Sequence, residues 1–217
     1  MDATTQQKTG KRALNRRNNR RAILTAALQC FTQKGYDNVT IRDIVKETDL
    51  AAGTFYNYFS SKQDIFAALL TDFVTDLNET LTNLRRSTRD QEDFIQSTYL
   101  ALFLATARAP LIYELAHQND RAIRSLFGSD ILNLAMVSLT DDVKMAVEQQ
   151  TLPNVDQALL CAAFFGVAYE LGMVVARRAA KHPEAADRIA HDATVFATDL
   201  FLGGLYRMQP LARPEAS

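Results

Sequence analysis

The polar side chains that could do chemistry cluster in one short stretch, residues 51–62 (AAGTFYNYFSSK). Hydroxyl, amide and ammonium groups dominate it, and such groups donate hydrogen bonds to phosphate oxygens. Asn57 is the best candidate for reading a base, because its amide can pair bidentately with adenine. The small residues Ala52 and Gly53 would let the backbone approach a duplex closely. The stretch therefore predicts a contact with DNA.

Two short helices joined by a tight turn must position these groups. Thr40 is a good N-cap for a helix over 41–48, and Asp43 places a negative charge near the positive end of the helix dipole. The turn falls at 49–50, and a third helix is expected over 51–58. A helix-turn-helix of this kind lays its second helix in the major groove. On periodicity alone, an ordinary amphipathic hairpin would fit equally well.

The sequence around these helices resembles a known family. The run 53–62 (GTFYNYFSSK) is similar to the recognition helix and following turn of the TetR family of bacterial transcriptional regulators, and 40–44 (TIRDI) is similar to its second helix. Residues 27–36 look like the end of its first helix. The resemblance spans 16–66 and favours the DNA-binding interpretation. It implies an all-α fold, with an N-terminal three-helix helix-turn-helix DNA-binding domain and a C-terminal helical ligand-binding and dimerisation domain.

Two departures from the family pattern affect the third helix. Asp49 stands where members often have Gly, and Ala51-Ala52 stand where they often have Ser-Lys, so this helix should lack a side-chain cap. Together, the residue types and the resemblance predict DNA contacts from Arg16, Arg17, Arg20, Thr40, Arg42, Ala52, Gly53, Thr54, Tyr56, Asn57, Tyr58 and Lys62.

Charge divides the chain in the same way. Residues 1–62 hold eleven Lys and Arg against five acidic residues, a net charge of +6, whereas the whole chain carries −1. A basic head on an acidic remainder is typical of a DNA-binding protein, although a basic run is often only a solvated face. We expect a disordered basic arm over 1–14, near phosphate or the minor groove, the helix-turn-helix domain over 15–61, and the ligand-binding and dimerisation domain over 62–217.

The second domain is predicted to be entirely helical. The first three of the five prolines, at 110, 153 and 183, stand at helix starts, and no long period-two alternation indicates a sheet. The predicted helices are 62–87, 91–107, 110–117, 118–127, 129–150, 154–180 and 183–207.

Two of these helices are apolar around most of their circumference. A helix of this kind must be covered on all sides, so 154–180 and 183–207 are predicted to pair with their symmetry mates in a four-helix dimer interface, as the resemblance also implies. The alternative is that both are buried within a monomer. The predicted interface residues are Leu160, Phe164, Val167, Leu171, Val175, Phe196, Leu200 and Gly203. A homodimer would present two recognition helices to a palindromic operator.

Aromatic residues in the second domain predict an apolar cavity for a small lipophilic effector. Its candidate lining is Tyr99, Phe103, Tyr113, His117, Phe127, Phe165, Tyr169, Glu170 and Met173. Arg108, His117 and Glu170 could orient a polar group of the ligand. Each of these residues could equally belong to the core, and Glu170 could pair with Arg177 or Arg178. By resemblance, the effector would act through the helix that begins near Lys62.

The sequence argues against several other classes of protein. It has no phosphate-binding glycine loop and no HExxH, and the two histidines His182 and His191 are too few for a metal site, so neither an enzyme nor a metal or other cofactor is expected. Cys30 and Cys161 suggest core residues. No apolar stretch predicts a membrane segment, so we expect a cytoplasmic protein. Its most natural role is a repressor, and an activator with or without an effector is the alternative.

Overall fold

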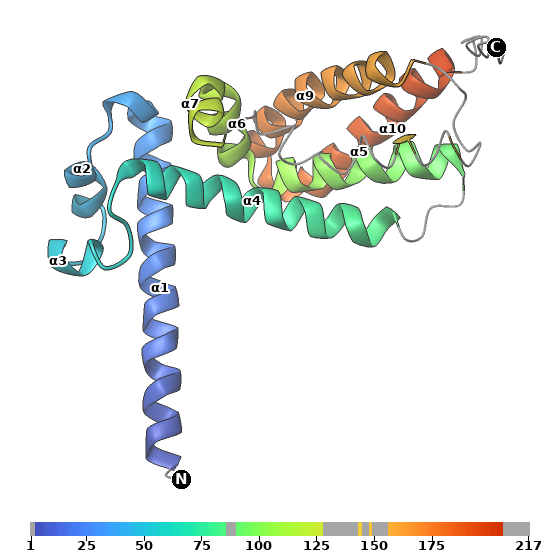
Figure 1. The fold of residues 1–217 in the computed structure, drawn as a ribbon. Coiled ribbons are helices and arrows are strands. Elements are labelled where there is room, and N and C mark those ends of the chain that lie inside the picture. The colour runs from blue at the N-terminus through green and yellow to red at the C-terminus, as the bar shows by residue number, and fades with distance from the viewer. Residues whose placement is uncertain (1–2, 86–89, 128–142, 145–147, 149–155, 206–217) are drawn as a thin grey trace, which may run out of the picture. The chain divides into compact units, whose positions relative to one another are not determined.

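The computed structural model describes residues 3–85, 90–127, 143–144, 148 and 156–205, and these residues form no β-strand (Figure 1). The all-α prediction is therefore confirmed for this part of the chain. The elements are α1 (Ala3–Lys34), η1 (Tyr36–Asn38), α2 (Ile41–Lys46), α3 (Ala52–Phe55), α4 (Lys62–Arg85), α5 (Gln91–Arg108), α6 (Pro110–Gln118), α7 (Asp120–Phe127), α9 (Gln157–Lys181), η2 (Pro183–Ala185) and α10 (Ala186–Leu205).

The chain divides into two compact units, Met1–Thr71 and Asp72–Ser217, which we call the head and the body. Helix α4 begins at Lys62, where the second domain was predicted to start, and it supplies residues to both units. Each unit has its own buried apolar residues, as expected for a small domain attached to a larger one.

The head closes around one side of α1. Ile23 and Phe31 of α1, Ile44 of α2 and Phe55 of α3 are essentially inaccessible to solvent. Phe66 from the start of α4 is also fully buried. Helix α1 ends at Lys34. The next residue, Gly35, has a φ of 79°, a conformation that glycine adopts without strain and that lets the chain turn into η1.

Helix α1 differs from its prediction. The sequence suggested a disordered arm over 1–14, whereas the structure continues α1 to Ala3. Once a helix is nucleated, each added residue forms a further hydrogen bond at little entropic cost. Residues 3–22 contain no proline and are rich in Ala, Gln, Lys and Arg, which favour helix. These residues therefore extend the helix that the head core nucleates.

The body is built mainly from α5, α6, α9 and α10. Helices α5 and α10 run antiparallel, because Arg108 pairs with Asp187 near one end while Tyr99 contacts Phe201 near the other. Asp90 caps α5 and Asp156 caps α9 through side-chain hydrogen bonds to backbone N–H groups. Most predicted helix bounds agree within a few residues. The predicted helix 129–150 lies largely outside the described residues.

One described helix, α9, is long and apolar enough to cross a membrane, and α5 with α6 would qualify if their 98° bend were a broken span. In the structure, α9 contacts α5, α6 and α10. Of its most apolar window, 39% is buried against the chain itself. This is the pattern of a core helix that leaves part of its apolar surface uncovered.

Candidate nucleic-acid interface

The recognition segment, residues 51–58, consists of α3 and the turn that follows it. Phe55 is fully buried, whereas Gly53, Tyr56 and Asn57 are exposed, Tyr56 with 58% of its surface accessible. Space around Gly53 is open, since no atom lies within 4 Å of where a Cβ would stand. The segment therefore presents a hydroxyl, an amide and a bare stretch of backbone to solvent.

The helical part of this segment is shorter than predicted. Only Ala52–Phe55 form α3, and Ala51 at the N-cap makes no side-chain hydrogen bond, as expected from the missing serine. Four residues make barely one turn of helix, too few to be stable in isolation. Contacts with the rest of the head must hold the segment in place.

Helix α1 provides such contacts at the far end of the segment. The amide nitrogen of Asn19 donates a hydrogen bond to the hydroxyl of Tyr58 at 3.2 Å. The next residue, Arg20, places its guanidinium 6.0 Å from the ring centre of Phe59, within range of a weak cation–π contact. Neither pairing could be predicted from the sequence, because both depend on how α1 packs beside the turn.

Thr40 and Asp43 form a complete capping box at the start of α2. The backbone N–H of Thr40 donates to the Asp43 carboxylate at 2.9 Å, and the backbone N–H of Asp43 donates to the Thr40 hydroxyl at 3.3 Å. Lys34 adds an ion pair at 2.9 Å. Hydrogen bonds from Thr40 and from Lys34 hold the pKa of Asp43 well below its usual range. The Thr40 hydroxyl is thus already used within the head, while Arg42 beside it is exposed.

Lys62 has a role that the sequence did not predict. Its ammonium donates to the backbone carbonyls of Tyr36, Asp37 and Val39 at 2.9, 3.0 and 3.2 Å, and it lies 4.7 Å from the ring centre of Tyr36. An ammonium has three donors, and these carbonyls satisfy all of them. The structure therefore corrects the expected phosphate contact, because Lys62 instead ties the start of α4 to η1.

A second capping box, missed in the sequence, starts α4. The Asp64 backbone N–H donates to the Ser61 hydroxyl at 3.1 Å, and the Asp64 carboxylate accepts from the Ser61 N–H at 3.1 Å and from the Ser60 N–H and hydroxyl. These bonds lower the pKa of Asp64. The signal was present as Ser61-x-x-Asp64, the spacing of a capping box.

The basic residues of α1 fall on different sides of the helix. Arg12, Arg16, Arg17 and Arg21 are exposed, and Arg20 is half-buried. Residues three or four apart share a helix face, whereas neighbours two apart do not. Of the arginines predicted to contact DNA, Arg16 therefore shares the face of Asn19, which contacts the recognition segment. Arg20 contacts Phe59 next to that segment, and Arg17 lies on the other side of the helix, so we no longer expect Arg17 to contact the same DNA.

The head matches a family of known proteins. Residues 23–69 fit the family described as bacterial regulatory proteins, tetR family. The chain is 40% identical over 72 residues to the HTH-type transcriptional regulator YvdT of Bacillus subtilis (strain 168), covering 33% of this chain and 36% of that one. It is 30% identical over 64 residues to the HTH-type transcriptional repressor DhaR of Mycobacterium sp. (strain GP1), covering 30% and 32%.

Residues 23–69 of the head thus match the TetR family. The alignments span only about a third of the length of these two curated relatives. Solved structures extend the likeness of fold to most of the chain. The fatty acid degradation regulator FadR of Bacillus halodurans is 20% identical, with 88% of this chain and 97% of that one covered and a TM-score of 0.71. The ketosteroid regulator KstR2 of Mycobacterium tuberculosis is also 20% identical, with 86% and 94% covered and a TM-score of 0.67. As the sequence predicts, this is a family of transcriptional regulators and not of enzymes.

In the body, the structure brings several predicted pocket residues together. The ring of Tyr99 stacks on Phe164 at 4.2 Å and on Phe103 at 5.7 Å. Tyr99 is fully buried, which raises the pKa of its phenol, and its hydroxyl has no hydrogen-bond partner. An unpaired buried hydroxyl is costly, so a polar group of a ligand would relieve it.

His117 and Tyr113 form a second group around α9. His117 stacks on Tyr169 at 4.3 Å, and its buried Nε2 atom has no partner. The Tyr113 hydroxyl donates to the Tyr169 carbonyl at 3.0 Å and lies directly over Gly172. Burial raises the pKa of Tyr113.

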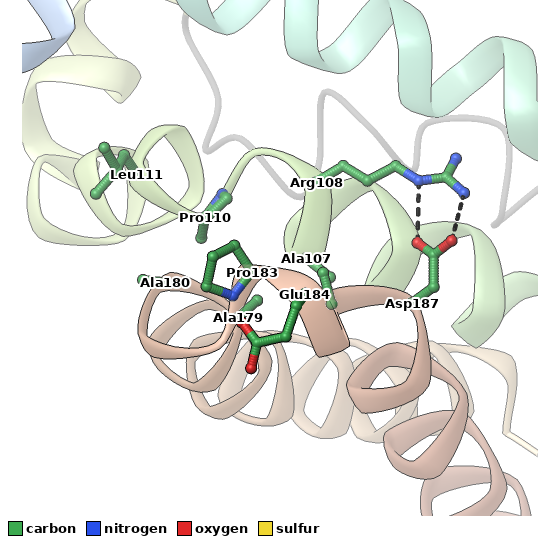
Figure 2. Close-up of a pocket in the computed structure, with 10 residues that line it drawn as sticks. Ala107, Arg108, Pro110, Leu111, Ala179, Ala180, Pro183, Glu184 and Asp187 are labelled. Atoms are coloured by element: carbon green, nitrogen blue, oxygen red, sulfur yellow. Dashed lines mark hydrogen bonds and ion pairs between the residues drawn. The ribbon is translucent and has the colours of Figure 1, made fainter.

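The remaining candidate lining residues differ in burial. Met173 is buried and Phe165 half-buried, whereas Glu170 is exposed. The side chain of Phe127 lies outside the described part of the chain. Arg108 does not point into the aromatic interior. Its guanidinium pairs with Asp187 at 3.3 and 3.4 Å, on the rim of an open surface cleft of about 570 Å³ (Figure 2).

The predicted dimer residues on α9 need correction. Leu160, Phe164 and Val175 are at least 95% buried within their own chain, so they cannot also face a partner. Val167 and Leu171 are half-buried. The periodicity could not reveal this, because α9 is apolar on nearly every side and the pattern does not mark the side that packs inward.

A different apolar surface on α9 and α10 remains exposed. We call it the α9–α10 face, and it comprises Leu159, Ala163, Gly166 and Val174 of α9 with Val195, Phe196, Leu200 and Gly203 of α10. Leu159 exposes 69% of its surface and Phe196 exposes 58%. A groove of about 310 Å³ runs between the two helices beside Leu171, Val174 and Phe196. Phe196, Leu200 and Gly203 were predicted members of the interface.

Proposed function

We propose that this chain is a homodimeric, sequence-specific DNA-binding transcriptional regulator of the cytoplasm. In this proposal it acts as a repressor that binds a palindromic operator and is released by a small lipophilic effector. The observation that carries the proposal is the recognition segment, which exposes Tyr56 and Asn57 to solvent while Phe55 anchors it in the head core. It lies inside the region that matches the TetR family.

The recognition segment would read one half-site in the major groove. Asn57 would pair with a base edge, and the hydroxyls of Thr54 and Tyr56 would donate to phosphate oxygens. Arg42 on α2 and Arg16 on α1 are exposed and would add phosphate contacts. The positive charge of the head favours a polyanionic partner such as DNA.

The α9–α10 face supports a homodimer. Large apolar side chains left exposed on two neighbouring helices are typical of an interaction site. A twofold axis would place the same face on both protomers, and two heads would then meet a palindromic site. The small residues Ala163 and Gly166 would let the two α9 helices approach closely.

The interior of the body supports an effector site. Among the described residues, four buried polar atoms there have no hydrogen-bond partner, namely Tyr99 Oη, Thr106 Oγ1, His117 Nε2 and Thr198 Oγ1. Aromatic rings surround two of them, so a mostly apolar ligand with a hydrogen-bonding group suits this environment. The names of FadR and KstR2 point to fatty acid and ketosteroid metabolism, but a likeness of 20% identity carries the fold alone.

Release would pass through α4, which belongs to both units. An effector that favours one arrangement of α4 would weaken operator binding by the difference in its affinity for the two states, typically about 1–3 kcal/mol. An activator of the same fold would use the same parts with the opposite dependence on ligand.

Footprinting tests the proposal. The purified full chain should protect a stretch with twofold symmetry in the DNA flanking its own gene, or in a duplex selected from random sequence. Only diffuse, salt-sensitive coating of every duplex would contradict sequence-specific binding. A discrete footprint that appears only with added fatty acid or sterol would contradict release by the effector. Transcription measured from the bound promoter would then decide between an activator and a repressor that binds DNA with its ligand.

Asn57→Ala tests the placement of the recognition segment. It should relax base preference at one position of each half-site, with a loss of about 1–3 kcal/mol on the preferred base. Competition between operators that differ at single positions measures this preference. Unchanged discrimination at every position would mean that another residue reads the bases.

A further inference from the structure

One face of α1 runs from the core of the head out into solvent. Residues at alternating steps of four and three share this face, and they are Arg12, Arg16, Asn19, Ile23, Ala26 and Cys30. Ile23, Ala26 and Cys30 are buried in the head, Asn19 is half-buried, and Arg12 and Arg16 are exposed. This face of α1 is therefore apolar within the head and basic toward the N-terminus.

The bond between Asn19 and Tyr58 fixes where this face points. It turns the face toward the recognition segment. Arg16 and Arg12 precede Asn19 by three and seven residues, so they lie about 4.5 and 10.5 Å further along the helix axis. Figure 1 shows α1 continuing well beyond α2 and α3. Both arginines therefore extend past the recognition segment on its own side.

Helix α1 offers these arginines no partner of its own. Its 32 residues include eight Lys and Arg and neither Asp nor Glu. Basic residues on neighbouring turns repel one another slightly, and no acidic residue within the helix offsets that repulsion. An anionic surface from outside the chain would offset it.

We propose that Arg12 and Arg16 form a phosphate-binding surface that holds the duplex backbone beside the half-site read by the recognition segment. This inference rests on the proposed function. It also differs from the disordered arm expected from the sequence, which could have reached either phosphates or the minor groove. A helix with its side chains is about 10–12 Å wide and cannot enter a minor groove about 6 Å wide, so this part of α1 contacts phosphates from outside.

The opposite face of α1 provides a matched control. Arg17 and Arg21 each lie two residues from Asn19, about 200° around the helix, and both are exposed. The pairs Arg12/Arg16 and Arg17/Arg21 therefore carry the same charge on the same helix and differ in direction. Arg→Gln substitution keeps a good helix former in every case.

The test compares R12Q/R16Q with R17Q/R21Q in the full chain, using a duplex selected from random sequence by the wild-type protein. Binding is measured from about 50 to 200 mM salt, the range over which phosphate contacts weaken. R12Q/R16Q should flatten the slope of log affinity against log salt by about 0.9 for each phosphate that is no longer neutralised, about 1.8 for each protomer. It should also abolish hydroxyl-radical protection of the backbone flanking the half-site. R17Q/R21Q should keep the wild-type slope and protection.

Equal decreases from both pairs would overturn the inference, because they would show a general effect of charge. Wild-type behaviour of R12Q/R16Q would overturn it as well. Circular dichroism on both variants checks that α1 keeps its helix. If the wild-type protein selects no duplex at all, the proposed function itself fails, and that result is distinct from either outcome on the variants.

Discussion

The head and the body treat their polar side chains in opposite ways. Around the recognition segment, Thr40, Ser61, Asp64 and Lys62 all have hydrogen-bond partners within the head. In the body, four buried polar atoms lack one, and no described side chain of the head shares that condition. Satisfied groups hold one conformation, whereas unsatisfied groups favour whatever supplies a partner. The polar groups of the head thus favour one conformation, and the unpaired groups of the body support the proposed effector site.

The largest test of a rigid head removes the aromatic side chain that joins α4 to it. Phe66 is fully buried, 4.5 Å from the ring centre of Tyr36 and 6.1 Å from that of Phe31. Phe66→Ala should cost about 3–5 kcal/mol of head stability. Hydrogen exchange should show faster exchange in α1 and α2 while α5 and α10 keep their protection. Equal loosening of both units would show that they unfold together.

Lys62→Met tests whether this lysine stabilises the head or binds DNA. The substitution keeps the apolar stem and removes the ammonium that holds three carbonyls, so it should lower head stability by about 1.5–3 kcal/mol. Urea unfolding at fixed protein concentration measures this, with Lys46→Met on the exposed side of α2 as a control. Where the protein still folds, the salt slope of DNA binding should not change. A flatter slope would instead support the phosphate contact of Lys62 that was predicted from the sequence.

Gly172→Ala probes the packing of the body. A Cβ at this position would overlap the Tyr113 hydroxyl and stand 2.6 Å from the ring carbon that carries it, and Tyr113 is buried. Overpacking of this kind costs about 1–3 kcal/mol. Gly166→Ala on the same helix meets nothing within 4 Å in its own chain, so in the dissociated protomer it should stabilise α9 through helix propensity by up to about 1 kcal/mol. At protein concentrations low enough to dissociate the proposed dimer, thermal unfolding of the two variants should therefore shift in opposite directions.

Acid pH should lower the stability of the head more than that of the body, and this is the smallest effect among the predictions. The pKa values of Asp43 and Asp64 are lowered by hydrogen bonds, so they stabilise the head at neutral pH, and this contribution is lost as pH falls below about 4. Burial raises the pKa values of Tyr99 and Tyr113 in the body and of Tyr36 in the head, so both units lose stability as pH rises above about 10. Hydrogen exchange across the acid range should show the head opening first. The Asp64→Asn variant should have a weaker acid dependence.

Local signals were enough to predict most of the elements. Thr40 before α2 and Pro110 at the first residue of α6 mark helix starts through their own backbone and side-chain chemistry. Such marks do not depend on distant packing. The missing cap at Ala51 also follows from its side chain alone.

Properties that depend on tertiary packing could not be predicted. Lys62 has the same sequence neighbourhood whether it meets phosphates or the carbonyls of η1, and only the approach of η1 decides between them. The inward side of α9 was ambiguous because apolar residues surround it, and Leu160 therefore turned out to be core while Leu159 is exposed. The length of α1 depended on a nucleus that forms in the head core.

The close approach of Tyr113 to Gly172 also constrains how this protein can diverge. Any residue other than glycine at position 172 would displace the ring, and a smaller residue at position 113 would leave a void beside α9. A substitution at either position 113 or position 172 therefore needs a compensating substitution at the other. In an alignment of close homologues the two should change as a pair, and a lineage that loses the tyrosine gains the freedom to reshape this part of its interior.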